Sequence, residues 1–550
     1  MRRFWLLLKP DQKEIKNVYI YAVFNGLVNL SLPVGIQAII NLIQGGQIST
    51  SWLILVIFVI VGIAITGLLQ ISQMRITEHL QQKIFTRAAF EFAYRIPRIK
   101  LEALYHHYAP ELMNRFFDIV SVQKGLSKIL IDFSTASIQV VFGLLLLSFY
   151  HPFFIVFSLI LIILVYFIFK LTSKKGLETS LDESKNKYKV AHWLEELART
   201  RITFKLAGPT DLHLQRMDKH VGGYISARES HFKVLVQQYM LMVGFKLMVA
   251  TGLLVIGSIL VMEQQMNIGQ FVAAEIIILL VLSSVEKLIL SLESIYDVLT
   301  SLEKIGQVSD LQLEYDKNGI DIASHVKDGG LGVTLKNFKF SYPDKRRSIF
   351  ENASFRVDPG EKLLVMGDSD SGKSTLLYLL AGLYDLEEGS ISFNNLPLGN
   401  LDRHQLRSVI GDCLMDEHLF DGTIFENISM GRKNATLENV QWAVKNLGLE
   451  SFINNLPKGY NTLVHSEGRQ FSKGIIDKLL IARSIADLPR LLLIKDTFTS
   501  LVGSERYELM RFLTSKDRPW TLVITSKDPT IVSMVDRVVV CQDRLLIEKI

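Results

Sequence analysis

The chain has 550 residues, of which 49% are hydrophobic, and its formal net charge is +5. A mean hydropathy of +0.26 is too high for an ordinary soluble protein, and the length indicates several domains. A nucleic-acid-binding protein is expected to carry a basic stripe, and the small net charge of this chain does not indicate one. Cys413 and Cys541 are far apart and form no CxxC pattern, which argues against a disulfide framework.

Six long apolar runs occupy the first 300 residues. Each is close to the ~20 residues that a helix needs to cross a bilayer. They lie near residues 17–43, 51–73, 129–149, 152–172, 236–262 and 269–291. Six such runs are more than the buried core of a soluble domain explains. Residues 1–300 are therefore predicted to form an all-α, six-helix transmembrane domain in contact with membrane lipid.

The connections between these runs alternate in charge. Segments 45–52, 150–153 and 262–270 contain no lysine or arginine, whereas segments 74–128 and 170–233 contain many. The positive-inside rule therefore predicts a multi-pass protein of the cytoplasmic (inner) membrane with both termini in the cytoplasm. The two long segments keep a helical spacing of apolar residues, which predicts helices that continue past the bilayer. Disordered connectors are the alternative.

Ionisable residues inside apolar runs are functional candidates. Lys246 and Glu286 each lie about 25 Å from the outer boundary, at ~1.5 Å per residue, so the two side chains could pair. Glu275 lies closer to the outside. The alternative is that Lys246 and Glu286 are solvated near the inner face. Nothing in the sequence specifies a transported substrate.

After a polar linker predicted over 301–330, the pattern changes to strands, glycine turns and short helices. Segments 332–342 and 362–367 are predicted strands, and 371–384 is a predicted helix. Between the second strand and the helix, residues 367–374 read GDSDSGKS and satisfy GxxxxGK[ST]. In this motif loop amides cradle phosphates, and the lysine, here Lys373, reaches the outer phosphates. Residues 331–550 are therefore predicted to form an α/β P-loop NTPase domain.

With this motif in place, the chain resembles the ABC exporter family, whose half-transporters join six membrane helices to one nucleotide-binding domain and act as dimers. The resemblance also rests on FSYP at 340–343, LFDGTIFENI at 419–428, LPKGY at 456–460 and IAR at 481–483. The membrane half is most similar to the branch that exports peptides and proteins. The family's long cytoplasmic loops dock on the nucleotide-binding domain.

The resemblance implies ATP and Mg²⁺ as cofactors, with Ser374 as a Mg²⁺ ligand. It also implies a nucleotide site in which the base stacks on an aromatic ring and the phosphates bind the loop. The corresponding residues are Tyr342, Gly367, Asp368, Ser369, Asp370, Ser371, Gly372, Lys373, Ser374 and Thr375.

Several family motifs carry other residues in this chain. The family's glutamine falls on Met415, whose thioether cannot ligate Mg²⁺, and the switch histidine falls on Ser526. The signature LSGGQ reads Phe471-Ser472-Lys473-Gly474-Ile475. Ser472 and Gly474 match the signature, so some contact with a partner's γ-phosphate is retained. Lys473, however, replaces a glycine that permits close backbone approach.

The stretch LLLIKDTFTSLV, residues 491–502, corresponds to the family's metal-binding strand. Aligned without a gap, Lys495 falls on the metal-site aspartate and Asp496 on the catalytic glutamate. Shifted by one residue, Asp496 falls on the metal-site aspartate and Thr497 on the catalytic glutamate. In both alignments the full-length catalytic carboxylate is missing. A lysine at or beside the metal position places the Mg²⁺ requirement in doubt.

These losses remove groups that hold the metal and position the attacking water, and such positioning is most of what a protein contributes to phosphoryl transfer. Losing two carboxylates should cost several kcal/mol of barrier. We therefore expect very slow hydrolysis, or none, at this chain's own site.

Two interpretations of Lys495 are open. Its ammonium could contact the phosphates, or pair with Asp370 or Asp496 in an empty site; alternatively it extends to water without a role. Asp370 stands where the family usually has glycine, and its carboxylate either opposes phosphate or points to solvent.

The prediction that follows is a half-transporter paired with a catalytically intact partner. One alternative is a homodimeric exporter that hydrolyses ATP despite its divergent motifs. The other is a non-transporting membrane sensor or assembly factor built on the same fold.

Overall fold

The computed structural model describes residues 8–44, 50–314, 319–326, 329–344, 347–414, 418–496, 500–501 and 503–549. The chain forms two compact units. The first comprises Met1–Arg98 and His107–Leu311, and the second comprises Ile99–His106 and Gln312–Ile550. A short interval from the helical half of the sequence thus belongs to the second unit.

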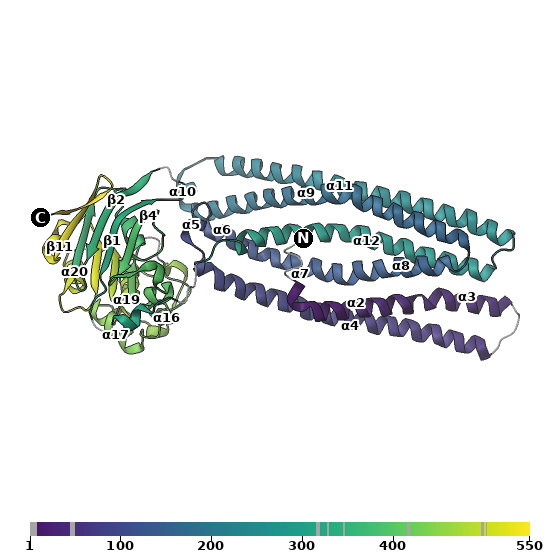
Figure 1. Cartoon of the computed structure of the whole chain (residues 1–550), viewed down its shortest axis with the longest axis horizontal. Helices are drawn as coiled ribbons and strands as arrows, with labels where there is room; N and C mark the ends of the chain where they lie inside the picture. Colours follow the sequence, from purple (N-terminus) through teal and green to yellow (C-terminus); the bar gives the residue numbers. More distant parts are fainter. Residues whose placement is uncertain are drawn as a thin grey trace. The chain divides into compact units, whose positions relative to one another are not determined.

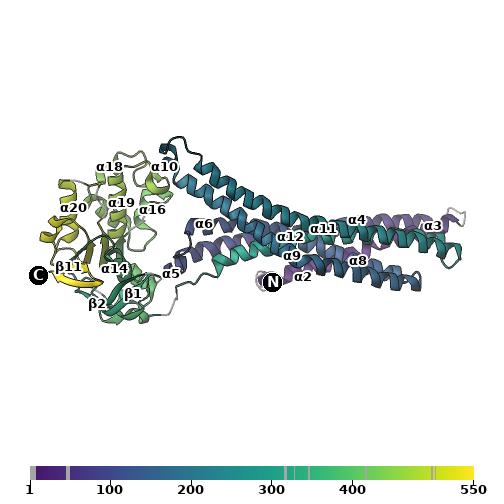
Figure 2. The same ribbon diagram turned by 90° about the horizontal axis from the view of Figure 1, so that it is seen from above.

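The first unit is a bundle of long helices (Figures 1 and 2). Within the described residues, six helical passages are long and apolar enough to cross a membrane. The main helices are α2 (Gln12–Asn29), α3 (Ser31–Gln44), α4 (Thr50–Arg95), α7 (Asp118–Lys128), α8 (Ser134–Ser148), α9 (Pro152–Arg199), α11 (Leu212–Met262) and α12 (Ile268–Ser309), with short α6 (Ala109–Asn114) and α10 (Arg201–Leu206) between them. The predicted six-helix domain is confirmed.

The long segments are helical, as their apolar spacing predicted. Helix α4 has 46 residues and α9 has 48. At 1.5 Å per residue each extends about 70 Å, roughly twice the thickness of the hydrocarbon layer. Disordered connectors are therefore excluded for the described parts of these segments. Helix α12 continues to Ser309, so the expected linker over 301–330 begins as helix.

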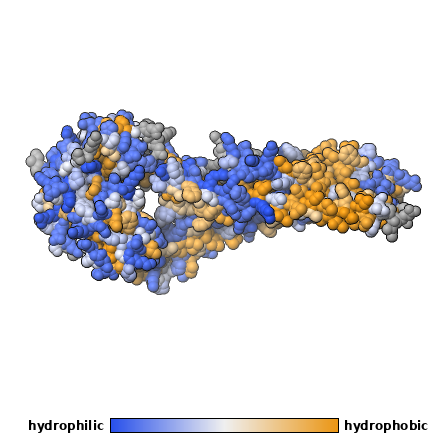
Figure 3. Space-filling view, turned by 90° about the horizontal axis from the view of Figure 1, so that it is seen from below, coloured by the Kyte–Doolittle hydropathy of each residue, from blue (hydrophilic) through white to orange (hydrophobic). Residues whose placement is uncertain are grey.

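The apolar side chains of this unit cover one section of the long helices (Figure 3). On α4, Ile57, Phe58, Ile63 and Leu68 are each more than half exposed in the isolated chain. Exposed contiguous aliphatic and aromatic surface is unfavourable in water and favourable in lipid. This section is the part of the bundle suited to the bilayer core.

The second unit contains a six-stranded sheet in the order β12-β11-β3-β10-β9-β6 and a four-stranded antiparallel sheet in the order β2-β1-β4-β5. The strands are β1 (Val333–Ser341), β2 (Ser348–Val357), β3 (Lys362–Gly367), β4 (Glu388–Phe393), β5 (Leu396–Pro397), β6 (Ile410–Cys413), β7 (Gly422–Thr423), β8 (Leu463–Val464), β9 (Leu491–Lys495), β10 (Thr521–Thr525), β11 (Arg537–Gln542) and β12 (Leu545–Lys549). The helices are α5 (Leu101–Leu104), α13 (Ile322–His325), α14 (Lys373–Leu380), α15 (Arg403–Ser408), α16 (Ile424–Ser429), α17 (Leu437–Asn446), α18 (Glu450–Asn454), α19 (Lys473–Ile485) and α20 (Ser504–Thr514). The predicted α/β class is confirmed.

Three neighbouring strands of the larger sheet set the position of the site. Strands β3, β10 and β9 are parallel, and Thr525 of β10 is in register with both Val365 and Lys495. Apart from Met366, which is half-buried, their apolar residues are buried, as expected for parallel strands covered on both faces. Because the carboxyl ends of parallel strands meet at one edge, the segments after β3, β9 and β10 come together there.

Candidate nucleotide site and its metal position

The phosphate loop joins β3 to α14 through a backbone that requires glycine. Gly372 has φ +101°, and a Cβ at this position would lie 2.8 Å from Ile349 Cγ2 and 2.9 Å from Phe350 Cζ. A side chain there would therefore clash and be strained. The loop thus brings its backbone close to β2 before entering α14, which begins at Lys373.

The ammonium of Lys373 is folded back onto its own loop. It donates to the carbonyl of Gly367 at 2.7 Å, to the carbonyl of Asp368, and to Ser371 Oγ at 3.3 Å. Burial lowers the pKa of Lys373 from its usual value. An entering phosphate group would replace these oxygens as the partner of the ammonium.

A cavity of about 280 Å³ lies beside this loop, lined by Tyr342, Arg347, Ile349 and residues 370–375. The Tyr342 hydroxyl lies 3.0 Å from Thr375 Oγ1, so the aromatic residue predicted to stack on the base borders the phosphate loop. The Tyr342 ring also stacks on Tyr105, with centroids 5.7 Å apart and planes at 23°. The cavity therefore joins an aromatic wall to the loop.

Tyr105 comes from the interval Ile99–His106, which packs within the second unit. Lys100 Nζ lies 3.3 Å from Asp385 Oδ2, and the backbone amide of Asp385 donates to Glu102 Oε1 at 3.1 Å. The Tyr105 hydroxyl donates to Asp344 Oδ2 at 3.2 Å. The prediction that the first long segment docks on the nucleotide-binding domain is therefore confirmed for this interval.

Asp370 occupies the left-handed region, with φ +61°, and its side chain borders the cavity. Replacing Asp370 with glycine removes left-handed strain and a negative charge near the phosphates, each worth about 1 kcal/mol or less. We expect Asp370→Gly to tighten ATP binding by about five-fold, measured by calorimetric titration of the full chain. Asn395→Gly is the control for backbone strain, because Asn395 has φ +66°, is exposed and does not line this cavity. Unchanged affinity in Asp370→Gly would show that the carboxylate points away from the phosphates.

Asp496, directly after β9, is engaged inside the protein. Its Oδ2 accepts from Arg506 Nη2 at 2.5 Å and from the Ser526 hydroxyl. Its side chain is only 4% exposed. Arg506 Nε also lies 3.1 Å from Asp528 Oδ2, so the guanidinium joins two carboxylates. One oxygen of the carboxylate beside Lys495 is thereby paired with an arginine, whereas its other oxygen, Oδ1, is buried and has no hydrogen-bond partner among the described residues.

The side chains around the metal position do not fit Mg²⁺, which requires a near-octahedral set of oxygen ligands. Ser374 offers a hydroxyl and Lys495 offers an ammonium. Asp496 Oδ2 is held by Arg506 and Ser526, which leaves Asp496 Oδ1 as the one carboxylate oxygen of this residue without a partner in the described part of the chain. Met415 and Thr497 lie outside the described residues. Among the residues that are described, no group of three or more His, Cys, Asp or Glu could hold a metal ion.

The signature residues 471–475 stand at the start of α19. Ser472 is the N-cap residue, and Lys473 Nζ lies 3.2 Å from Asp477 Oδ1 while its side chain is 69% exposed. The other carboxylate oxygen of Asp477 accepts from the Ser500 hydroxyl. The cation that replaces a glycine in the signature is thus oriented by the first turn of its own helix.

Two residues near the site were missed by sequence reasoning. Lys527 Nζ donates to Ser369 Oγ of the phosphate loop at 3.1 Å. Its place directly after Ser526 is a signal that could have drawn attention to it. Arg506 has no such signal, because only folding of α20 brings it to Asp496.

Lys246 and Glu286, whose helical spacing made pairing one of two open alternatives, form an ion pair in the membrane unit. Lys246 Nζ of α11 lies 2.6 Å from Glu286 Oε2 of α12, and the two side chains are 33% and 30% exposed. Glu275 is half-buried nearer the start of α12. A paired lysine and carboxylate are far less costly near lipid than either charge alone.

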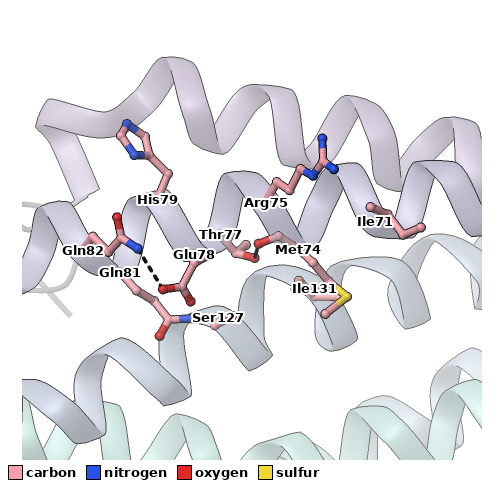
Figure 4. A pocket seen from close by; sticks show the side chains of 10 residues that line it. All are labelled: Ile71, Met74, Arg75, Thr77, Glu78, His79, Gln81, Gln82, Ser127 and Ile131. Carbon is pink, nitrogen blue, oxygen red and sulfur yellow. Dashed lines mark hydrogen bonds between the residues drawn. The ribbon is translucent and has the colours of Figure 1, made fainter.

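A groove of about 620 Å³ opens along α4 (Figure 4). Its lining passes from Ile71, Met74 and Ile131 to polar residues, including Glu78, which accepts a hydrogen bond from Gln82 at 3.0 Å. The groove therefore lies where α4 changes from apolar to charged, the level expected for the edge of the hydrocarbon layer.

Two family models match the chain: ABC transporter transmembrane region over residues 17–285, and ABC transporter over residues 350–499. The chain belongs to the ABC transporters, with a transmembrane domain fused to one ABC nucleotide-binding domain. It is 27% identical over 335 residues to the alpha-hemolysin translocation ATP-binding protein HlyB of Escherichia coli, a match covering 60% of this chain and 46% of that protein. The leukotoxin translocation ATP-binding protein LktB of Mannheimia glucosida matches with the same identity and coverage.

The chain thus spans about half the length of these curated relatives, 46% in each case. A solved structure of a bacterial Atm1-family ABC exporter with ATP bound has the same fold, with a TM-score of 0.81. The match covers 97% of this chain and 94% of that one at 18% identity. At this identity the likeness shows the fold alone.

Proposed function

We propose that this chain is a half-subunit of an ABC-type exporter that binds ATP, hydrolyses it very slowly or not at all at its own site, and works beside a partner with complete motifs. One observation carries the proposal. The phosphate loop is formed around Lys373, whereas Asp496 is held by Arg506 and Ser526. Binding chemistry is retained where hydrolytic chemistry is not.

The loss of hydrolysis follows from what phosphoryl transfer requires of a protein. An in-line attack needs a positioned water and compensation of the charge that develops on the phosphates. Asp496 is bound to a guanidinium, and Ser526 replaces the switch histidine. A carboxylate that already pairs with arginine is a poor base for water, so the barrier rises by several kcal/mol.

The need for a partner follows from the way in which ABC exporters form their ATP sites, to which both chains of the dimer contribute. In the family each ATP lies between the phosphate loop of one chain and the signature of the other. A homodimer would contain two identical impaired sites. With an intact partner, the partner's phosphate loop and carboxylates would face Ser472 and Gly474 of this chain, and that composite site could turn over.

The transported substrate is proposed to be a peptide or protein. The two bacterial relatives are named for translocation of alpha-hemolysin and leukotoxin. The charge of the connections further supports a cytoplasmic location for both termini, so export would proceed from the cytoplasm. The Lys246–Glu286 pair is the candidate polar contact within the membrane unit.

The proposal is tested by measuring vanadate-sensitive ATPase activity of the full chain, purified alone and with its native partners. We expect at most about 1% of the activity of the complex from the chain alone, equivalent to a barrier difference of about 2.7 kcal/mol. Rapid hydrolysis by the chain alone, abolished in Lys373→Ala, would instead establish a homodimeric ATPase. A cellular role untouched by Lys373→Ala and by loss of the partner would indicate a sensor or assembly factor.

A further inference from the structure

We infer that this site binds the phosphate chain of a nucleotide without a divalent metal, through the ammonium groups of Lys373, Lys495 and Lys527, while Arg506 pairs with Asp496. The inference rests on the proposed binding of ATP by this chain. It goes beyond that proposal by specifying the bound species, which is the metal-free nucleotide. It also assigns binding roles to Lys495 and Lys527, and a positioning role to Arg506.

The first step is the placement of the three lysines at one edge of the sheet. Lys495 is the last residue of β9, Lys527 follows β10 by two residues, and Lys373 follows the loop after β3. These strands are adjacent and parallel, and Thr525 is in register with Lys495 on one side and Val365 on the other. Neighbouring strands lie ~4.8 Å apart, which is within reach of lysine side chains.

The second step is the contact that Lys527 makes with the phosphate loop. Its ammonium donates to Ser369 Oγ at 3.1 Å, and its side chain is exposed. It can therefore exchange a neutral hydroxyl for a charged phosphate oxygen, and such charge-assisted hydrogen bonds are about twice as strong as neutral ones. Burial, followed by the charges of Lys527 and Lys495, lowers the pKa of Lys373. Lys527 and Lys495 therefore repel the ammonium of Lys373, while the carboxylate of Asp368 attracts it. A bound phosphate chain would supply further negative charge to all three cations.

The third step concerns the role that Mg²⁺ otherwise plays. The ion neutralises phosphate charge and is held by protein oxygens. Here cations already stand at the strand ends, and a metal ion would add to their repulsion. A phosphate chain without metal carries more negative charge than its Mg²⁺ complex, so it complements three ammonium groups better.

The fourth step is the ion pair between Asp496 and Arg506. A free carboxylate at this edge would repel phosphate and attract Mg²⁺. Arg506 weakens both effects, because its Nη2 lies 2.5 Å from Asp496 Oδ2 and its Nε lies 3.1 Å from Asp528 Oδ2, although Asp496 Oδ1 has no partner within the described ranges. Ser526 donates to the same oxygen of Asp496. Arg506 is thus a positioning residue that reduces the negative charge of Asp496 and Asp528 at this edge of the sheet.

The test is calorimetric titration of the detergent-purified full chain with ATP, in EDTA and in Mg²⁺. We expect dissociation constants within about three-fold of each other, or tighter binding in EDTA. Lys527→Gln should weaken binding in EDTA about ten-fold, equivalent to ~1.4 kcal/mol, with a smaller effect in Mg²⁺. Lys445→Gln, at an exposed position on α17, should change neither value.

In Arg506→Gln, ATP should bind about ten-fold more tightly in Mg²⁺ than in EDTA, because the carboxylate of Asp496 is released from its ion pair. Arg511→Gln on the same helix is the matched control, since Arg511 is exposed. Thermal unfolding of each variant verifies that it is folded, and Arg506→Lys, which keeps the charge, should restore most of the binding in EDTA.

The outcomes separate this inference from the proposed function. Absence of ATP binding in both buffers would overturn the proposed function itself. Binding that is ten-fold or more tighter with Mg²⁺ in the unmodified chain would overturn the metal-free site and leave the proposed function standing. Metal-independent binding that is insensitive to Lys527→Gln would overturn the role of Lys527.

Discussion

Lys373→Ala is expected to weaken ATP binding at least about a hundred-fold. The substitution removes the cation of the phosphate loop, and charge-assisted contacts of a partly buried ammonium with phosphate are worth about 3 kcal/mol or more. It also leaves the carbonyl of Gly367 and the hydroxyl of Ser371 without the donor that now binds them. Titration of the full chain with ATP measures the loss.

The control for this prediction is Lys433→Ala, because Lys433 is exposed and distant in sequence from every nucleotide motif. Its ATP affinity and its unfolding temperature should match those of the unmodified chain. If Lys373→Ala retained affinity within about five-fold, the phosphate loop would not be the ATP site, and the proposed function would fail at its first step.

Gly411→Ala is expected to destabilise the nucleotide-binding domain by about 3 kcal/mol, the upper end of what overpacking costs. A Cβ on Gly411 would lie 2.1 Å from the carbonyl oxygen of Ser484 and 2.8 Å from Pro489 Cγ. The first contact is with the backbone of α19, so relief requires that the whole signature helix move away from β6. Thermal unfolding of the full chain in detergent should show an earlier transition for this domain.

Gly399→Ala is the matched control, because a Cβ at Gly399 would meet nothing within 4 Å. Its unfolding curve should overlay that of the unmodified chain. An unchanged transition in Gly411→Ala would mean that β6 and α19 are less closely packed than the structure indicates. A shifted transition would show that the signature helix depends on this contact.

The pairing of Asp496 with Arg506 offers one physical explanation for the substitutions around it. Lysine at the end of β9 and serine after β10 would each be harmful in an ATPase that depends on Mg²⁺ and a general base. With Arg506 paired to Asp496 and Asp528, Lys495 adds a cation to Lys373 and Lys527 at the edge where a phosphate chain would bind. Retention of Lys373 beside lost hydrolytic groups is then expected of a site selected for binding.

The sequence alone determined the membrane half and the phosphate loop. A helix that crosses a membrane is apolar over consecutive residues, so its hydropathy can be read directly from the sequence. Apolar runs such as 51–73 and 152–172 therefore identify spanning helices without knowledge of their packing. Loop 367–374 could also be predicted from the sequence, because a phosphate-binding loop needs glycines and a lysine at fixed short spacing. The pairing of Lys246 with Glu286 was also within reach, since helical rise places both at one depth.

Only the tertiary structure brought Arg506 to Asp496 and Lys527 to Ser369. These contacts join residues 10 and 158 positions apart. The first depends on how α20 packs after β9, and the second depends on the pairing of β10 with β3. Strand order follows from packing of the whole domain, which local periodicity does not encode. The sequence thus revealed which hydrolytic groups are missing, whereas the fold decided which charges stand in their place.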